Sequence, residues 1–579
     1  MIRRLMGCIR EYKKPTILAP IFITLEVVME VIIPLYMAKL IDEGIDGGDF
    51  HALIVTGAAL VVFVIMSLVF GVLAGKYAAV ASSGFAKNLR HDMFHNVQTY
   101  SFRNIDKFSA SSIVTRLTTD VQNLQNSYQM LVRIALRTPA MLIFSLVMAF
   151  MVNAELAVIF LCIMPVLAAG IFLIMTKVHP IFKRVFKTYD KLNGVVQENL
   201  HGIRVVKSFV REEYEKKKFG DISGEIYSDF VKAEKRMTLT NPLMQTCMYA
   251  AIILLSWFGA RIIVLSGGRD FSTGELMSMM TYAMQILGSL MMLSMVFVMI
   301  IMSRASAERV VEILDEKSDV RSPANAVMDV KDGSVAFEDV SFSYSGKEDK
   351  CCLKNIDIEI PAGATVGILG GTGSGKSSLV QLIPRLYDVT KGSVKVGGLD
   401  VREYDLDVLR QEVAMVLQKN VLFSGTIKEN LRWGNENATD EEIIHACKLA
   451  CAHDFVSAFP DGYDTYIEQG GSNVSGGQKQ RLCIARALLK KPKILILDDS
   501  TSAVDTHTDA MIRKAFLEEI PDTTKFIIAQ RISSIQDADF TIVLDNGVVT
   551  GVGTHEELIE NNEIYREVYE AQQKGSVPQ

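Results

Sequence analysis

Long uncharged apolar stretches recur in this 579-residue chain, and nearly all of them lie before Arg304. A helix needs about 20 mainly apolar residues to cross ~30 Å of hydrocarbon. The first stretch runs from Thr16 to Ala38 and is interrupted only by Glu26 and Glu30. The others are Ala52–Gly75, Thr138–Val152, Leu156–Thr176, Met237–Ala260 and Leu276–Ser303. Together these stretches predict six membrane-spanning helices.

The distribution of charged residues predicts how these helices are oriented, because basic residues favour the cytoplasmic side. The first span is preceded by basic residues, namely Arg3, Arg4, Arg10, Lys13 and Lys14. The loop after it is acidic and contains Asp42, Glu43, Asp46 and Asp49. Lys183–Arg236 is again basic. We therefore expect a multi-pass plasma-membrane protein with both termini in the cytoplasm. Segments 77–130 and 177–236 have helical patterns and should extend the spans into the cytoplasm.

Several polar or polarizable side chains lie at membrane depth. Glu26 and Glu30 share one helix face because they are four residues apart. They either form a polar patch in a translocation path or, alternatively, pair with Arg or Lys or lie near a membrane interface. The last span is rich in methionine, including Met284, Met291 and Met295. These residues either line a cavity for substrate or serve packing and lipid contact.

Charge, cysteine spacing and length bear on the class of partner, the state of the cysteines and the number of domains. A net charge of −6 gives no reason to expect a nucleic-acid partner. The eight cysteines show no metal-ligand spacing and are expected to be unpaired thiols in a reducing compartment. The length predicts at least two domains, and the pattern after Arg304 is that of a soluble α/β domain.

A phosphate-binding loop stands out in this second region. Its residues fit GxxxxGK[ST], between the strand-like run Ala364–Leu369 and a helix-like run. The loop comprises Gly370, Gly371, Thr372, Gly373, Ser374, Gly375, Lys376, Ser377 and the following Ser378. We expect Lys376 to reach the β- and γ-phosphates of ATP and the Ser377 hydroxyl to bind Mg²⁺. Asp498, at the end of a buried strand, would hold the same ion.

The order of motifs resembles the nucleotide-binding domain of an ABC transporter. It consists of Tyr344, the phosphate loop, Gln418, an SGGQ signature, Asp498 and SAVD. With six spans and long intracellular extensions, the whole chain resembles a half-size, multidrug-type ABC exporter of the type IV fold. The segments Phe108–Val121 and Glu198–Glu215 resemble its coupling segments. The implied domains are a transmembrane domain over 1–303, a linker over 304–333, a nucleotide-binding domain over 334–570 and a tail over 571–579.

The resemblance also implies roles for individual residues. Tyr344 would stack on adenine, and Gln418 would sense the γ-phosphate and contact Mg²⁺. Two chains of this family pair head to tail, so the signature would close over ATP held by the partner. The signature residues are Ser475, Gly476, Gly477 and Gln478. Ser502 and Asp505 would carry signals between the two nucleotide sites.

Two residues depart from the family pattern. Asp499 stands where the family has a catalytic glutamate, and Gln530 stands where it has a switch histidine. A carboxylate one methylene shorter is displaced from the attacking water, and a misplacement of about 1 Å can cost ~100-fold in rate. Glutamine cannot titrate near neutral pH. The chain therefore resembles the degenerate-site subunit of a heterodimeric exporter.

In this interpretation a second half-transporter supplies the catalytic glutamate and histidine, and the complex exports amphipathic compounds such as drugs, lipids or peptides. The alternatives are a homodimeric exporter with slow ATP hydrolysis, and an ATP-gated regulatory membrane protein without active transport. The absence of a targeting peptide favours a bacterial membrane by analogy.

Overall fold

The computed structural model describes residues 1–347, 350–499 and 504–574. It divides into two compact units, which are treated separately. One unit contains Met1–Gln98 and Ala110–Glu316, and the other contains Thr99–Ser109 and Lys317–Gln579. The short segment 99–109 thus groups with the nucleotide-binding region, although it lies between two membrane helices in the sequence.

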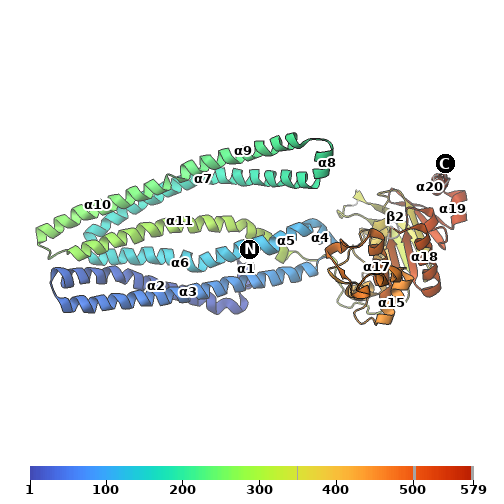
Figure 1. The fold of residues 1–579 in the computed structure, drawn as a ribbon, viewed down its shortest axis with the longest axis horizontal. Coiled ribbons are helices and arrows are strands. Elements are labelled where there is room, and N and C mark those ends of the chain that lie inside the picture. The colour runs from blue at the N-terminus through green and yellow to red at the C-terminus, as the bar shows by residue number, and fades with distance from the viewer. Residues whose placement is uncertain (348–349, 500–503, 575–579) are drawn as a thin grey trace. The chain divides into compact units, whose positions relative to one another are not determined.

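The first unit is entirely helical over its described residues (Figure 1). Its long helices are α2 (Lys13–Lys39), α3 (Phe50–Gln98), α6 (Val121–Val152), α7 (Ala154–His201), α9 (Glu212–Met237), α10 (Thr240–Ser266) and α11 (Thr273–Asp315). Short helical elements join them: α1 (Ile2–Gly7), η1 (Arg10–Tyr12), η2 (Leu40–Asp46), α5 (Ala110–Thr115), η3 (Arg116–Asp120) and α8 (Ile203–Ser208). Six helical segments of the described chain are long and apolar enough to cross a membrane. The prediction of six spans is confirmed.

Several of these helices continue far beyond the apolar stretches. The helix α3 runs on to Gln98 and α7 to His201, so the predicted helical extensions are present. The helix α11 continues through Asp315. The first part of the expected linker, which begins at residue 304, is therefore helical. Hydropathy alone marks where a span leaves the hydrocarbon, not where its helix ends, because backbone hydrogen bonding continues in water.

The polar residues of the first span have partners within the bundle. Arg137 of α6 donates to both carboxylate oxygens of Glu30 at 2.6 and 2.7 Å. Its guanidinium also lies 3.6 Å from Glu26. The Glu26 side chain is 13% exposed, and a side chain at Gly71 would meet its carboxylate. Of the two interpretations of these acids, the structure favours pairing with arginine.

We expect Arg137→Gln to lower the stability of the membrane unit by about 1–3 kcal/mol, because it removes the cation that contacts both Glu26 and Glu30. Thermal unfolding of the full chain in lipid nanodiscs measures this loss. Arg261→Gln, at an exposed position of α10, is the matched control and should change the midpoint little. A variant carrying Arg137→Gln and Glu30→Gln together should recover part of the loss, and an equal loss in both would contradict the pairing.

The second unit is built on two sheets. An antiparallel sheet has the order β2-β1-β4-β5, and a six-stranded sheet has the order β12-β11-β3-β10-β9-β6. The strands are β1 (Val335–Phe342), β2 (Leu353–Ile360), β3 (Thr365–Gly370), β4 (Lys391–Val396), β5 (Leu399–Asp400), β6 (Val413–Val416), β9 (Ile494–Asp498), β10 (Thr524–Ile528), β11 (Phe540–Asp545) and β12 (Val548–Gly553). The strands β7 (Gly425–Thr426) and β8 (Tyr466–Ile467) form a separate two-stranded antiparallel sheet.

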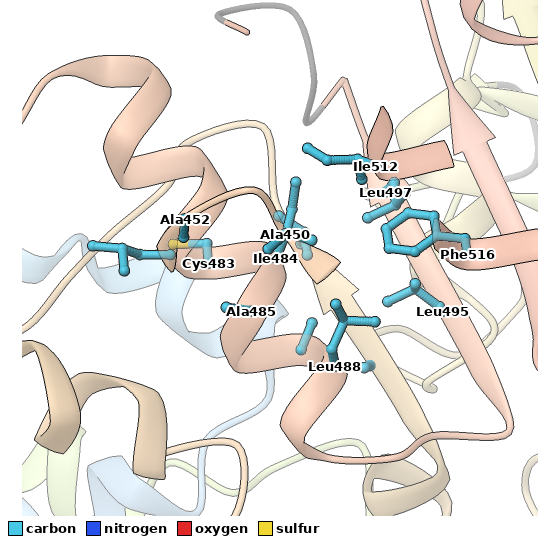
Figure 2. Packing of buried hydrophobic residues seen from close by; sticks show 14 of the residues in the cluster. Ala450, Ala452, Cys483, Ile484, Ala485, Leu488, Leu495, Leu497, Ile512 and Phe516 are labelled. Carbon is cyan, nitrogen blue, oxygen red and sulfur yellow. The ribbon is translucent and has the colours of Figure 1, made fainter. Parts of the chain in front are cut away.

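The antiparallel sheet shares one apolar core with the larger sheet, and the helices of this unit complete the packing. They are α12 (Lys376–Gln381), α13 (Leu406–Glu412), α14 (Ile427–Arg432), α15 (Asp440–Leu449), α16 (His453–Ser457), α17 (Gly476–Leu489), α18 (Thr506–Glu519), α19 (His555–Asn561) and α20 (Glu563–Lys574), with the short turns η5 (Gly462–Asp464), η6 (Gln469–Gly471) and η7 (Ile532–Ser534). Figure 2 shows side chains of α17, β9 and α18 in contact, including Leu488, Leu495 and Phe516. Complete burial of β9, on both of its faces, is typical of a parallel strand covered by helices.

A parallel core fixes where functional residues gather. The strands β3, β10, β9 and β6 pair in parallel. Their carboxyl ends therefore meet at one edge, which is where ligands bind in open α/β sheets. The phosphate loop follows β3, Asp499 follows β9 and Gln530 follows β10. All three lie at this edge.

The helix α4 (Phe102–Phe108) packs within this second unit. Ser101 caps it through a reciprocal pair of hydrogen bonds with Asn104. The Tyr387 hydroxyl donates to the Asp106 carboxylate at 2.8 Å, and the Phe102 and Tyr387 rings lie 6.1 Å apart. The contact lies just before the segment from Phe108 that sequence resemblance indicated as a coupling segment.

Candidate nucleotide site

The phosphate loop has the backbone of an anion cradle. Gly373 and Gly375 have φ angles of 83° and 97°, in a region that glycine adopts without strain. A side chain at Gly371 or Gly373 would meet no atom within 4 Å, so open space lies in front of the loop. The Ser374 hydroxyl is buried and has no hydrogen-bond partner among the described residues. Phosphate oxygens would supply an acceptor for such a group, so the loop fits a bound polyphosphate.

Lys376 extends along this loop. Its ammonium donates to the carbonyl oxygens of Gly370 and Gly371, both at 2.8 Å. Burial lowers the pKa of Lys376, while the nearby carboxylates of Asp498 and Asp499 raise it. The Lys376 ammonium has three N–H donors, and two of them bind loop carbonyl oxygens, which leaves one N–H for a phosphate oxygen.

The residues expected at Mg²⁺ lie together. The Ser377 hydroxyl donates to the Asp498 carboxylate at 3.0 Å, and Asp498 is 4% exposed. Burial raises the pKa of Asp498, and the Ser377 hydroxyl opposes that shift. One hydroxyl and one carboxylate fit Mg²⁺, which usually takes its other ligands from phosphates and water. Gln418, the other expected ligand, is exposed, and its amide points to Asp499.

The two residues that depart from the family pattern contact each other. The Gln530 side-chain amide donates to the Asp499 carboxylate at 2.8 Å, and the Gln418 amide lies 3.5 Å from the same oxygen. Register explains the contact, because Ile528 of β10 pairs with Asp498 of β9. Asp499 itself has a φ of 48°, in the left-handed region that aspartate adopts more readily than most other non-glycine residues. The Asp499 carboxylate is thus held by amides at the edge of the site.

Tyr344 lies beside the phosphate-loop helix. Its hydroxyl shares a hydrogen bond of 2.9 Å with the Ser378 hydroxyl, and the residue is 45% exposed. The Tyr387 ring lies 5.1 Å away in an edge-to-face contact. Sequence reasoning missed Tyr387, because an aromatic residue after a helix carries no motif. Burial and the Asp106 carboxylate both raise the pKa of Tyr387, so its hydroxyl stays a donor at physiological pH.

The signature forms the start of α17. Ser475 caps the helix through a reciprocal pair of hydrogen bonds with Gln478. Ser475 and Gly476 are exposed, while Gly477 and Gln478 are partly covered. The helix is long enough for its amino-terminal end to carry positive potential. An exposed, capped helix end suits contact with a nucleotide held elsewhere.

Two residues are expected to carry signals between the nucleotide sites, Ser502 and Asp505. Ser502 lies outside the described residues. Asp505 caps α18, accepting from the Thr508 backbone N–H at 2.9 Å and from its hydroxyl at 2.8 Å. These bonds lower the pKa of Asp505.

The methionines of α11 differ in their exposure. Met279 is buried, whereas Met284, Met291 and Met295 are exposed. The last three are spaced by seven and four residues, so they share one helix face. Met277 is also exposed and extends this face by another seven residues. Met292 is exposed as well, and it lies on a neighbouring face because it directly follows Met291.

Comparison with known proteins agrees with this architecture. The model of the ABC transporter transmembrane region matches residues 16–290, and the ABC transporter model matches residues 353–502. A solved structure titled as a bacterial Atm1-family ABC exporter with ATP bound has the same fold, with a TM-score of 0.82, 24% identity and coverage of 98% of this chain and 100% of that one. The fold and the two matches define a half-size ABC transporter, with one transmembrane region and one nucleotide-binding domain.

The sequence relatives extend over nearly the whole chain. YfiB of Bacillus subtilis, described as an uncharacterized ABC transporter ATP-binding protein, is 35% identical and covers 99% of this chain and 98% of its own. Rv1273c of Mycobacterium tuberculosis, described in the same words, is 34% identical and covers 96% of each chain. This chain therefore belongs to the ABC transporter family, as a multi-pass membrane protein with a transport ATPase domain.

Proposed function

We propose that this chain is the degenerate-site subunit of a heterodimeric ABC exporter, with its nucleotide domain and both termini in the cytoplasm of a bacterial cell. The observation that carries the proposal is the 2.8 Å hydrogen bond from Gln530 to Asp499, next to a well-formed phosphate loop. The chain retains the groups that hold ATP and Mg²⁺ and lacks the groups that promote hydrolysis.

The hydrogen bond has a direct chemical consequence. The Gln530 amide occupies an oxygen of the carboxylate that stands at the general-base position, so that oxygen is engaged away from the attacking water. General-base action contributes about 10²–10⁴ to the rate of a proton-transfer step, so its loss leaves ATP bound and nearly intact. Gln530 also cannot change charge near neutral pH, whereas histidine can. We infer that ATP at this site acts as a stable clamp between the two nucleotide domains.

The exposed signature supports a partner. Ser475 and Gly476 lie at the open end of α17, where they can cover ATP held by a second chain. The turn after α8 exposes two large apolar side chains, with Phe209 72% and Val210 80% exposed, while α8 itself is mixed in character and includes Arg204 and Lys207. An exposed apolar patch at the tip of an intracellular helix pair favours docking on the partner's nucleotide domain.

The proposed cargo is a small amphipathic compound. The face of α11 formed by Met277, Met284, Met291 and Met295 presents flexible thioethers, which adapt to apolar groups of varied shape. Glu26 and Glu30 are already paired with Arg137, so they supply less negative potential than two free carboxylates would. Hydrophobic contact therefore contributes more to cargo binding than charge does.

The test compares two variants of the assembled complex. Asp499→Ala should change its ATPase rate by no more than about twofold, whereas replacing the partner's catalytic glutamate by glutamine should lower the rate about 100-fold or more. The chain purified alone should turn over Mg²⁺-ATP negligibly. Robust turnover by the chain alone would favour the homodimeric exporter instead, and cargo movement on ATP binding without hydrolysis would favour the ATP-gated protein.

A further inference from the structure

The last helix of the chain contacts the switch loop that carries Gln530. The Gln572 side chain of α20 donates to the Gln530 carbonyl oxygen at 2.8 Å. The side-chain amide oxygen of Gln572 accepts from the Ile532 backbone N–H at 2.9 Å. A single amide thus satisfies two backbone groups on either side of Arg531.

The helix α20 is itself firmly placed. Tyr565 is fully buried, and its hydroxyl and the His555 ring share a hydrogen bond of 2.7 Å. The Asn562 side chain accepts from the Tyr565 backbone N–H at 3.0 Å. On the other side of the contact, Ile532 is 1% exposed and belongs to the same apolar core as Tyr565. Gln572 therefore extends from a fixed helix to a loop whose following turn is also fixed.

On either side of Gln530, the described hydrogen bonds include that from the Ala529 N–H to the Ile368 carbonyl oxygen at 3.4 Å and that from the Ser534 N–H to the Arg531 carbonyl oxygen at 3.1 Å. Gln530 is exposed, and its side chain donates to Asp499, while its backbone carbonyl accepts from Gln572. In its proposed role as a contact to the terminal phosphate, Gln530 would move its side-chain amide away from Asp499 while Gln572 holds its backbone carbonyl. A backbone that is already in place costs less conformational entropy when ligand binds.

We propose that Gln572 is a positioning residue that holds the switch loop in place, so that the carboxy-terminal helix regulates how long ATP stays at this site. The inference rests on the proposed role of Gln530 as a contact to the terminal phosphate. Loss of Gln572 leaves the Gln530 carbonyl and the Ile532 N–H to water and lets the loop sample other conformations. ATP then dissociates faster, while the phosphate loop is unchanged.

The experiment measures dissociation of Mg²⁺-ATP labelled with a fluorophore from the full-length chain in lipid nanodiscs. Gln572→Ala should raise the dissociation rate about fivefold, the effect expected for the loss of two hydrogen bonds at a partly exposed position. Gln573→Ala is the matched control, because Gln573 is exposed and bonds within α20 to Tyr569. It should leave the rate unchanged. Gln572→Glu keeps the acceptor for Ile532 but loses the donor, and should fall between.

Double variants separate this role from a general loss of stability. In a Gln530→Ala background, Gln572→Ala should add almost nothing, because it acts through Gln530. Equal effects of Gln572→Ala with and without Gln530 would overturn the proposal, as would an unchanged rate in a folded Gln572→Ala chain. If Gln530→Ala itself leaves the rate unchanged, the role of Gln530 fails, and this inference fails with it. If Gln530→Ala speeds dissociation and Gln572→Ala does not, only the role of Gln572 is overturned.

Discussion

Replacing Asp499 by glutamate and Gln530 by histidine in the same chain is expected to raise the Mg²⁺-ATPase rate of this chain alone about 10²–10³-fold. The physical reason is that both residues of the hydrogen bond between Gln530 and Asp499, which is proposed to suppress hydrolysis, change together. The Gln530 amide no longer holds the Asp499 carboxylate at 2.8 Å, and a longer carboxylate reaches further over the phosphate loop. A histidine at 530 also restores a group that titrates near neutral pH.

Single substitutions give a graded test of the same idea. Gln530→His alone releases the carboxylate but leaves it too short, and Asp499→Glu alone leaves the Gln530 amide available to bind the new carboxylate. Each should therefore recover much less activity than the pair, and the effects should be strongly non-additive. Steady-state phosphate release from the purified chain in nanodiscs measures this. Adding Lys376→Ala to the double variant is the control and should remove the gained activity.

A double variant that stays inactive although it binds ATP would contradict this account. Glutamate at position 499 also carries a conformational cost. Asp499 has a φ of 48°, which aspartate tolerates better than glutamate does. The double variant should consequently be slightly less stable, which thermal unfolding can detect separately from activity.

The contact between Asp499 and Gln530 also illustrates how far sequence reasoning reaches. The two positions are identifiable from the motifs before and after them, and their departure from the family pattern is visible directly. Their hydrogen bond is not, because it depends on β9 and β10 being neighbours with Ile528 opposite Asp498. Strand order in a parallel sheet results from tertiary packing and leaves no local signal.

The membrane unit gives a similar contrast. Hydropathy predicts the six spans, because an uninterrupted apolar stretch has few alternatives. It cannot predict that Arg137 pairs with Glu30, since this depends on which faces of α2 and α6 meet. The placement of α4 with the nucleotide unit was also not predicted. Seven residues capped by Ser101 carry too weak a pattern to reveal that Tyr387 binds Asp106.

Gly476→Asp in this chain is expected to lower the ATPase rate of the assembled complex about 100-fold or more, the loss typical of removing one element that stabilises the transition state. Gly476 is exposed at the start of α17, just after the capping residue Ser475. The positive end of that helix is suited to a phosphate, and a carboxylate placed there repels it. The damage therefore falls on ATP held by the partner chain, at the site proposed to hydrolyse.

The contrasting variant is Lys376→Ala in the same chain. It removes a phosphate contact from this chain's own site, where little hydrolysis is expected, so the complex should retain most of its turnover. Photolabelling with an azido-ATP identifies which chain carries nucleotide: Lys376→Ala should reduce labelling of this chain, and Gly476→Asp should reduce labelling of the partner. The opposite pattern, with Lys376→Ala abolishing turnover and Gly476→Asp sparing it, would assign hydrolysis to this chain. The two variants change residues of one polypeptide but report on two different nucleotide sites, which makes them a direct test of the division of labour.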